Sequence, residues 1–404
     1  MKRRSFLRQA GVIGLASLLH PADHARAFAE TPDEWLRRWD ACRPTRAAST
    51  LGSLRDRVGA AHVAGKYCLT PKPFLREGAD QLLALGTRVG KFWFNPDGIA
   101  RSYPFNSRWP TMRRFLDLAE SEYFQELFAM PFSTLILEAH TPVENGWLSP
   151  QTDDFYERVQ REFYVLAARL YRACHARPVT IVLQHWEGDW LLRGRGGELW
   201  KPPPPDWRQR CERMVRWLRA RQAGVAQARA EQGQSAQCIV AHAAEVNRVA
   251  DLWDGIPTMT EHVLPEVELD LVSYSCYDGL RDPLTLWKCL TEIQRRARPT
   301  ALFGKRCLYI GEIGIPRMIS PSGLRERWDQ WLGGCWPRRS AKHPAMGTRT
   351  ATNSTATLPR PDGAVHDPQQ LRGFWLVKPD GSLSETGRYF TQLWRGVMTD
   401  PLPP

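Results

Sequence analysis

Residues 180–190 of this 404-residue chain read TIVLQHWEGDW, an apolar run that stops at the carboxylate of Glu187. Two further stretches have the same form. Residues 238–247 read CIVAHAAEVN and contain Glu245, and residues 307–316 read CLYIGEIGIP and contain Glu312. In each stretch mostly β-forming residues end at a glutamate, and loop-forming residues follow. Each pattern predicts a buried strand with an acidic residue at its carboxyl end.

Buried strands that carry reactive residues at their carboxyl ends are typical of (β/α)8 barrels. Strands alternating with helices along the chain imply parallel pairing through βαβ units. The predicted fold class is therefore α/β, a (β/α)8 TIM barrel, with an open parallel sheet as the alternative. We predict strands at 58–63, 88–94, 133–137, 179–184, 238–242, 269–275 and 307–311, and helices at 112–128, 153–176, 207–231, 283–298, 322–331 and 385–397.

The eighth unit of the barrel is the irregular one. Residues 334–372 have almost no apolar periodicity, and a structureless stretch of this length is unusual inside a compact domain. Three interpretations remain open: a disordered excursion with strand 8 at 374–377, a long lid, or a frameshifted stretch in the gene.

The N-terminus resembles a bacterial twin-arginine (Tat) export signal. Arg3 and Arg4 precede a short apolar stretch at 10–19, and Ala27-Phe28-Ala29 offers a cleavage site. The expected domains are a signal peptide at 1–29 and one barrel domain at 30–404. The expected location is periplasmic or extracellular.

Composition limits the partners that we expect. The formal charge of +12 falls to +8 on cleavage, because residues 1–29 carry five Lys or Arg and one Asp. The remaining basic residues are scattered, so we expect no nucleic-acid binding. The apolar stretch at 10–19 is too short to span a bilayer, so we expect no stable membrane insertion. The nine cysteines include no C-x-x-C pair. The oligomeric state is left open.

The chain contains 17 tryptophans, and several lie beside the predicted strand ends. Flat indole faces pair well with the C–H faces of sugar rings, although many tryptophans are simply core residues. Trp186 and Trp190 flank the carboxylates of Glu187 and Asp189. We therefore predict carbohydrate stacking at Trp186, Trp190 and Trp93.

Glu187 at strand 4 and Glu312 at strand 7 resemble the catalytic pair of the retaining (β/α)8 glycoside hydrolase clan, the cellulase and β-glycanase type. The G-E-I-G string at 311–314 is similar to the clan's strand-7 ending. The resemblance implies that Glu187 is the general acid/base and Glu312 the nucleophile. Tyr274 and Tyr277, in SYSCYD, also resemble the clan's aromatic residue that steadies the nucleophile.

The chain departs from the clan at two places. The clan usually has Asn before the strand-4 glutamate, and Trp186 stands here. The clan pattern also leaves Glu245 without a role. Further candidates for catalysis or substrate binding are Glu245, Asp189, His185 and Asn247.

The predicted function is a glycosidase that cleaves an oligo- or polysaccharide with retention and needs no cofactor. Retaining cleavage uses two carboxyls, one protonated and one ionised. A non-catalytic carbohydrate-binding barrel is one alternative. A metal-dependent hydrolase is another, which would draw on His62, His140, His185 and His242, but the chain has no H-x-H or H-E-x-x-H motif and no predicted metal site.

Overall fold

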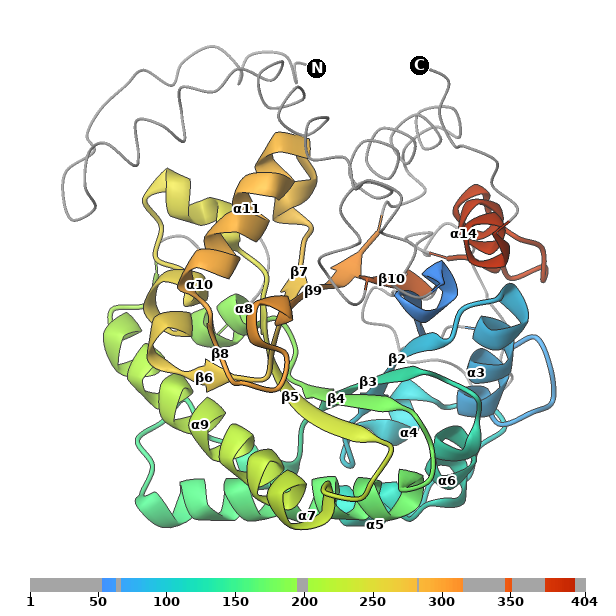
Figure 1. Ribbon diagram of the computed structural model, residues 1–404, viewed down its shortest axis with the longest axis horizontal. Coiled ribbons are helices and arrows are strands. Elements are labelled where there is room, and N and C mark those ends of the chain that lie inside the picture. The colour runs from blue at the N-terminus through green and yellow to red at the C-terminus, as the bar shows by residue number, and fades with distance from the viewer. Residues whose placement is uncertain are drawn as a thin grey trace. The chain divides into compact units, whose positions relative to one another are not determined.

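Eight parallel strands close into a barrel in the computed structural model of the protein (Figure 1). The structure describes residues 53–62, 67–194, 203–281, 283–314 and 375–396, and the backbone of 346–350. The order around the barrel is β1-β10-β9-β7-β5-β4-β3-β2, so β1 and β10 close the ring and the open-sheet alternative is wrong. The strands are β1 (Val58–His62), β2 (Val89–Phe94), β3 (Thr134–Ala139), β4 (Thr180–Gln184), β5 (Ile239–Val246), β7 (Leu271–Ser275), β9 (Leu308–Ile313) and β10 (Met346–Thr350).

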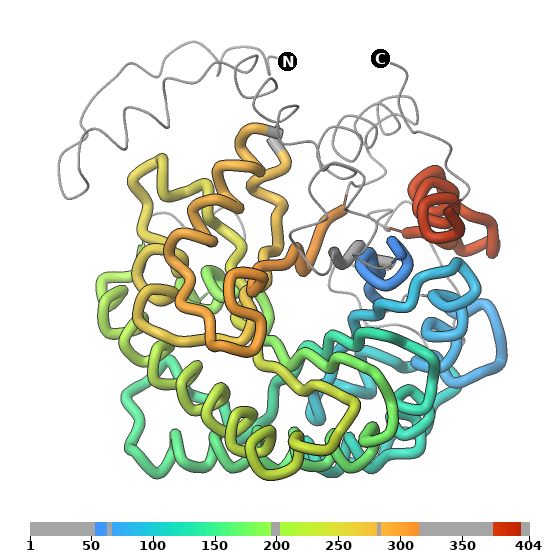
Figure 2. The backbone as a smooth tube through the Cα atoms, viewed as in Figure 1, coloured from blue at the N-terminus to red at the C-terminus, as the bar shows by residue number. Residues whose placement is uncertain are grey.

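Helices cover the outside of the barrel, and α7 and α9 lie side by side along it (Figure 2). Within the described ranges, none is long and apolar enough to cross a membrane. A separate small sheet pairs β6 (Glu268–Leu269) with β8 (Arg298–Pro299). The helices are α3 (Phe74–Leu85), α4 (Ile99–Ser102), α5 (Phe115–Ala119), α6 (Glu122–Ala129), α7 (Asp153–Cys174), α8 (Gly188–Arg193), α9 (Trp207–Gln232), α10 (Met259–His262), α11 (Pro283–Arg296) and α14 (Glu385–Arg395).

The helix predicted at 112–128 is divided in the structure. Ser121 has extended backbone angles, and its side chain accepts a hydrogen bond from the Phe124 N–H. A serine in this position ends one helix and caps the next, which separates α5 from α6. The signal peptide and the predicted helix at 322–331 lie outside the described residues.

The eighth strand, β10, lies inside the segment predicted to be irregular. Its backbone pairs with β1 on one side and with β9 on the other. The prediction of strand 8 at 374–377 was wrong, because Val377 instead forms an isolated antiparallel bridge with Leu383. The Val377 carbonyl also accepts a hydrogen bond from the Tyr67 hydroxyl at 2.5 Å.

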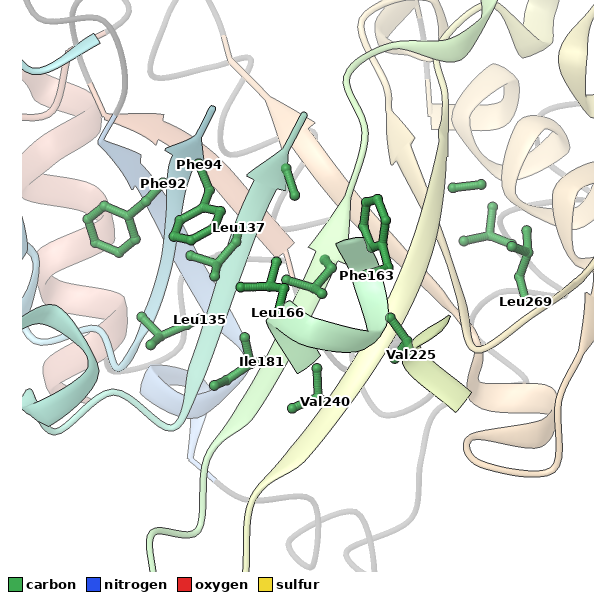
Figure 3. Packing of buried hydrophobic residues seen from close by; sticks show 14 of the residues in the cluster. Phe92, Phe94, Leu135, Leu137, Phe163, Leu166, Ile181, Val225, Val240 and Leu269 are labelled. Atoms are coloured by element: carbon green, nitrogen blue, oxygen red, sulfur yellow. The ribbon is translucent and has the colours of Figure 1, made fainter. Parts of the chain in front are cut away.

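Alternation along the strands separates an outer apolar layer from the barrel interior. Figure 3 shows part of the outer layer, where Phe92, Phe94, Leu135 and Leu137 pack with apolar residues of the surrounding helices. The interior has a second apolar cluster toward the amino ends of the strands. Its buried members are Val89, Ile136, Val182, Ala241, Ala243, Leu271 and Tyr309.

Polar side chains replace apolar ones toward the carboxyl ends of the same strands. Lys91 follows Val89 by two positions, Glu138 follows Ile136, and Gln184 follows Val182, so each pair shares a face. The barrel interior therefore changes from an apolar layer to a polar and charged layer within two residues along these strands.

A register shift in β9 turns Glu312 toward this upper layer. Tyr274 pairs with Ile310, whereas Ser275 pairs with Glu312, so one extra residue lies on the β9 side. That residue is Gly311. A Cβ on Gly311 would lie 1.8 Å from Ser273 Oγ and 2.6 Å from Glu245 Oε2, so the close approach requires glycine.

Candidate active site

Glu187 and Glu312 converge on the hydroxyl of Ser275. Glu187 lies three residues beyond β4, Glu312 lies in β9, and Ser275 ends β7. The Ser275 hydroxyl is 2.7 Å from Glu187 Oε1 and 3.5 Å from Glu312 Oε2. Both carboxyls are almost fully buried. The structure therefore brings together the two residues that the sequence singled out from different strands.

Lys91 of β2 lies beneath this pair and contacts three carboxylates. Its Nζ is 3.0 Å from Glu312 Oε1, 3.2 Å from Glu138 Oε2 and 3.5 Å from Glu245 Oε2. Burial disfavours the charge on Lys91, but the surrounding carboxylates outweigh that effect and raise the pKa of the ammonium well above its usual value. Lys91 is therefore a buried ammonium whose charge is balanced by carboxylates.

Glu245 is fully buried and is held by several donors. Its Oε2 accepts hydrogen bonds from Gln184 Nε2 at 2.9 Å and from the Ser273 hydroxyl at 2.7 Å. Its Oε1 accepts the backbone N–H of Glu187 at 3.2 Å. Burial raises the pKa of Glu245, and Lys91 opposes that shift. These contacts make Glu245 a residue that positions the turn carrying Glu187.

His185 supports the same turn as a neutral imidazole. Its Nε2 accepts the backbone N–H of Glu245 at 3.2 Å, so Nδ1 carries the proton and donates to the Trp186 carbonyl at 2.9 Å. Burial lowers the pKa of His185 to about 3. Both ring nitrogens are engaged, which suits a positioning role.

Asp189 and Asn247 join the start of α8 to the end of β5. The Asp189 N–H donates to Asn247 Oδ1 at 3.0 Å, and the Asn247 N–H donates to Asp189 Oδ2 at 3.1 Å. Asp189 also accepts the backbone N–H groups of Arg248 and Met259. The hydrogen bonds that the structure gives these two side chains are to backbone, so they hold the loops that carry the site.

Tyr274 does not contact the nucleophile candidate, which corrects one expectation drawn from the clan. It alternates with Ser273 and Ser275 along β7, so its ring faces outward, and its hydroxyl donates to Asp278 at 2.7 Å. Ser275, the next residue along β7, faces the two carboxyls instead. Tyr277, just beyond β7, is half-buried and remains a candidate.

The three candidate tryptophans differ in what surrounds them. Trp186 is 38% exposed and immediately precedes Glu187, so its indole face is available to a ligand. Trp93 is half-buried and lies in register with Glu138. Trp190 lies against two guanidinium groups, with Arg248 at 5.4 Å and Arg193 at 5.7 Å from its ring, so part of its surface is already used.

The histidines do not support the metal alternative. His62 faces outward and packs against Phe74, and His242 faces outward toward Phe163. Across the described ranges, no group of three or more His, Cys, Asp or Glu residues could hold a metal ion.

Three residues of the site were not predicted from the sequence: Lys91, Glu138 and Ser275. Lys91 had a usable signal, because a single charged residue interrupts the apolar stretch VGKFWF at 89–94. A lysine is almost never fully buried unless it is paired. Ser275 gave no comparable signal, because its role depends on the register between β7 and β9.

No family model matches the chain, and no curated protein matches it in sequence. Solved structures match its fold. A glutamate-to-alanine variant of GH5_18 from Streptomyces cattleya, in complex with Manb1-4GlcNAc, has a TM-score of 0.52 at 14% identity and is matched over 86% of this chain and 83% of its own.

Two further structures give similar values. A GH5_18 variant from Bifidobacterium longum, in complex with the same disaccharide, has a TM-score of 0.50 at 12% identity, over 84% of this chain and 78% of its own. A beta-glucuronidase from Bacteroides uniformis has a TM-score of 0.50 at 12% identity, over 87% of this chain and 36% of its own. These likenesses show the (β/α)8 barrel fold that such enzymes use.

Proposed function

We propose that the protein is a glycoside hydrolase that cleaves an oligo- or polysaccharide with retention of anomeric configuration. Glu187 is the general acid/base and Glu312 is the nucleophile. The observation that carries the proposal is the shared contact with Ser275. Because one hydroxyl reaches both carboxyls, their nearer oxygens are no more than about 6 Å apart, which suits the ~5 Å spacing of retaining enzymes rather than the wider inverting pair.

The surroundings of the two carboxyls suit their different roles. Glu312 lies 3.0 Å from the Lys91 ammonium, and a nucleophile has to be ionised. Glu187 contacts a neutral hydroxyl and is almost fully buried. Burial favours the protonated form that an acid catalyst needs.

The reaction follows two steps. Glu312 attacks the anomeric carbon while Glu187 gives its proton to the departing oxygen, which leaves a glycosyl ester on Glu312. Glu187 then takes a proton from water, and that water attacks the same carbon and releases the sugar. Trp186 supplies an apolar face for a ring beside the cleavage point.

The test is hydrolysis of a panel of aryl glycosides and oligosaccharides, with the first-formed anomer followed by NMR. We expect hydrolysis of at least one substrate with retention, and loss of turnover in Glu312→Gln with glycan binding preserved. Binding without cleavage by the unmutated protein would instead favour a carbohydrate-binding barrel. Inversion would overturn the assigned roles.

We also propose that the protein is exported through a Tat-like signal. The support is the sequence of residues 1–29, with Arg3 and Arg4 ahead of the apolar stretch. Replacement of both by lysine should keep the protein in the cytoplasm, as measured by cell fractionation. Unchanged export of that variant would contradict the proposal.

A further inference from the structure

Lys91 is a buried charge that makes or breaks no bond in the proposed reaction. It lies in β2 between Gly90 and Phe92, which face the outer layer, so its side chain enters the barrel above Val89. The side chain is 1% exposed. A lysine so enclosed does not reach substrate, and its effect has to pass through the groups that it touches.

The number of carboxylates around Lys91 equals the number of N–H donors on its ammonium. A lysine ammonium has three N–H donors, and carboxylates of Glu138, Glu245 and Glu312 all lie within 3.5 Å of it. Two of these carboxylates come from β3 and β5 and hold the ammonium together with Glu312. Glu312 is the nearest of the three.

An ionised carboxylate in a water-poor site is costly unless a positive charge compensates it. Glu312 is 2% exposed, and its Oε1 contacts the ammonium while its Oε2 faces Ser275. The side chain is thus bound at one oxygen and directed toward Glu187 at the other.

We propose that Lys91 is a positioning residue that keeps Glu312 ionised and oriented for attack. This inference rests on the proposed function and deepens it. Glu138 and Glu245 hold the ammonium in place, so Lys91 acts as a fixed charge and does not transfer its proton.

The experiment compares the pH dependence of kcat/KM in three variants. Lys91→Met removes the charge and keeps the length of the side chain. Its acid limb should move to higher pH by about 1–3 units, because the opposite charge beside the carboxylate is lost. We expect kcat to fall and KM to change little. Lys91→Arg keeps the charge, so its acid limb should remain near that of the unmutated protein.

Arg221→Met is the matched control. Arg221 and Glu144 form another fully buried ion pair, 3.2 Å apart, separate from the ion pairs that Lys91 makes with Glu138, Glu245 and Glu312. Its loss should lower stability as the loss of Lys91 does, with no displacement of the acid limb. An unmoved limb in folded Lys91→Met, or equal displacement in Arg221→Met, would overturn the proposal.

A second readout separates this inference from the proposed function. NMR of protein labelled with 13C at the glutamate carboxyls follows Glu312 without any turnover, with Glu312→Gln assigning its signal. In Lys91→Met the Glu312 signal should titrate at higher pH than in the unmutated protein. Absence of any hydrolysis alongside that displacement would contradict the enzyme assignment alone. Identical titration in both proteins would contradict the role of Lys91.

Discussion

Glu245 in the barrel and Asp251 in the loop that follows it are both buried, and their charges are compensated in different ways. At the barrel mouth, three carboxylates share the ammonium of Lys91. In the loop after β5, Asp251 alone contacts two guanidinium groups, Arg193 Nη1 at 3.0 Å and Arg248 Nε at 2.9 Å.

The two kinds of charge compensation suit different roles, catalysis in one case and support of a loop in the other. A carboxylate that accepts hydrogen bonds from two guanidinium groups is held in one position, which suits the support of a loop. Carboxylates that crowd around one ammonium repel each other, so the ionisation of each depends on that single positive charge. The mouth is therefore suited to a reactive carboxylate and the loop to stability.

The largest expected effect at the mouth is that of Glu312→Gln. This change keeps the shape of the side chain and removes the nucleophile, so kcat/KM should fall by about 10⁴-fold or more. Steady-state kinetics measures the loss, and a calorimetric scan shows whether the fold is intact. Activity within tenfold of the unmutated protein would place the nucleophile elsewhere.

Asp251→Asn should have the largest effect in the loop, and it should act on stability. The buried guanidinium of Arg193 and the half-buried one of Arg248 each lose a charged partner, which should lower the free energy of unfolding by about 3–5 kcal/mol. Denaturant unfolding measures this change. The acid limb of the pH profile of kcat/KM should stay in place. Its displacement would contradict the assignment of Asp251 to stability alone.

Glu187→Gln should lower the rate by about 10²–10⁴-fold on substrates whose leaving group needs protonation. The loss should be much smaller for aryl glycosides with good leaving groups, because these depart without an acid. Comparison of the two substrate types by kinetics checks the role. An equal loss on both would argue that Glu187 is not the acid.

Ser275→Ala should have a smaller effect, about tenfold in kcat. It removes a hydrogen bond to Glu187 and a longer contact to Glu312 but leaves both carboxyls in place. Ser107→Ala is a matched control, since that hydroxyl donates to the Phe105 carbonyl outside the site. Equal kcat values for the two variants would show that the Ser275 hydroxyl does not contribute to catalysis.

Trp186→Ala should have the smallest effect, confined to binding. The side chain is exposed, so stability should change by no more than about 0.5 kcal/mol. KM for oligosaccharides should rise with kcat nearly unchanged. An unchanged KM on every glycan that is cleaved would show that this ring does not contact substrate.

Much of the barrel could be predicted from the sequence, because its strands are apolar runs ended by polar residues. That pattern located Glu187 and Glu312 and placed them on different strands of one parallel barrel. Residues such as Phe155, Val159 and Phe163, spaced along one helical face, likewise predicted α7.

Other features depend on pairing rather than on local pattern. Whether Tyr274 or Ser275 faces the site follows from the register of β7, and Glu312 faces inward because of the irregularity at Gly311. The strand β10 lacks an apolar run, so the sequence could not separate it from the irregular segment around it. Glu138 lies in β3, and it belongs to the site because Lys91 of the neighbouring strand contacts it. The sequence does not show that contact.

The most direct test is to trap the covalent intermediate with 2-deoxy-2-fluoro glycosides of the sugar that the protein cleaves, and to map the label by mass spectrometry of the digested protein. The account predicts one labelled peptide, with the sugar attached to Glu312, and no label in Glu312→Gln. A label on Glu245 or Glu138, or hydrolysis by inversion with no label, would contradict the pairing of Glu187 with Glu312.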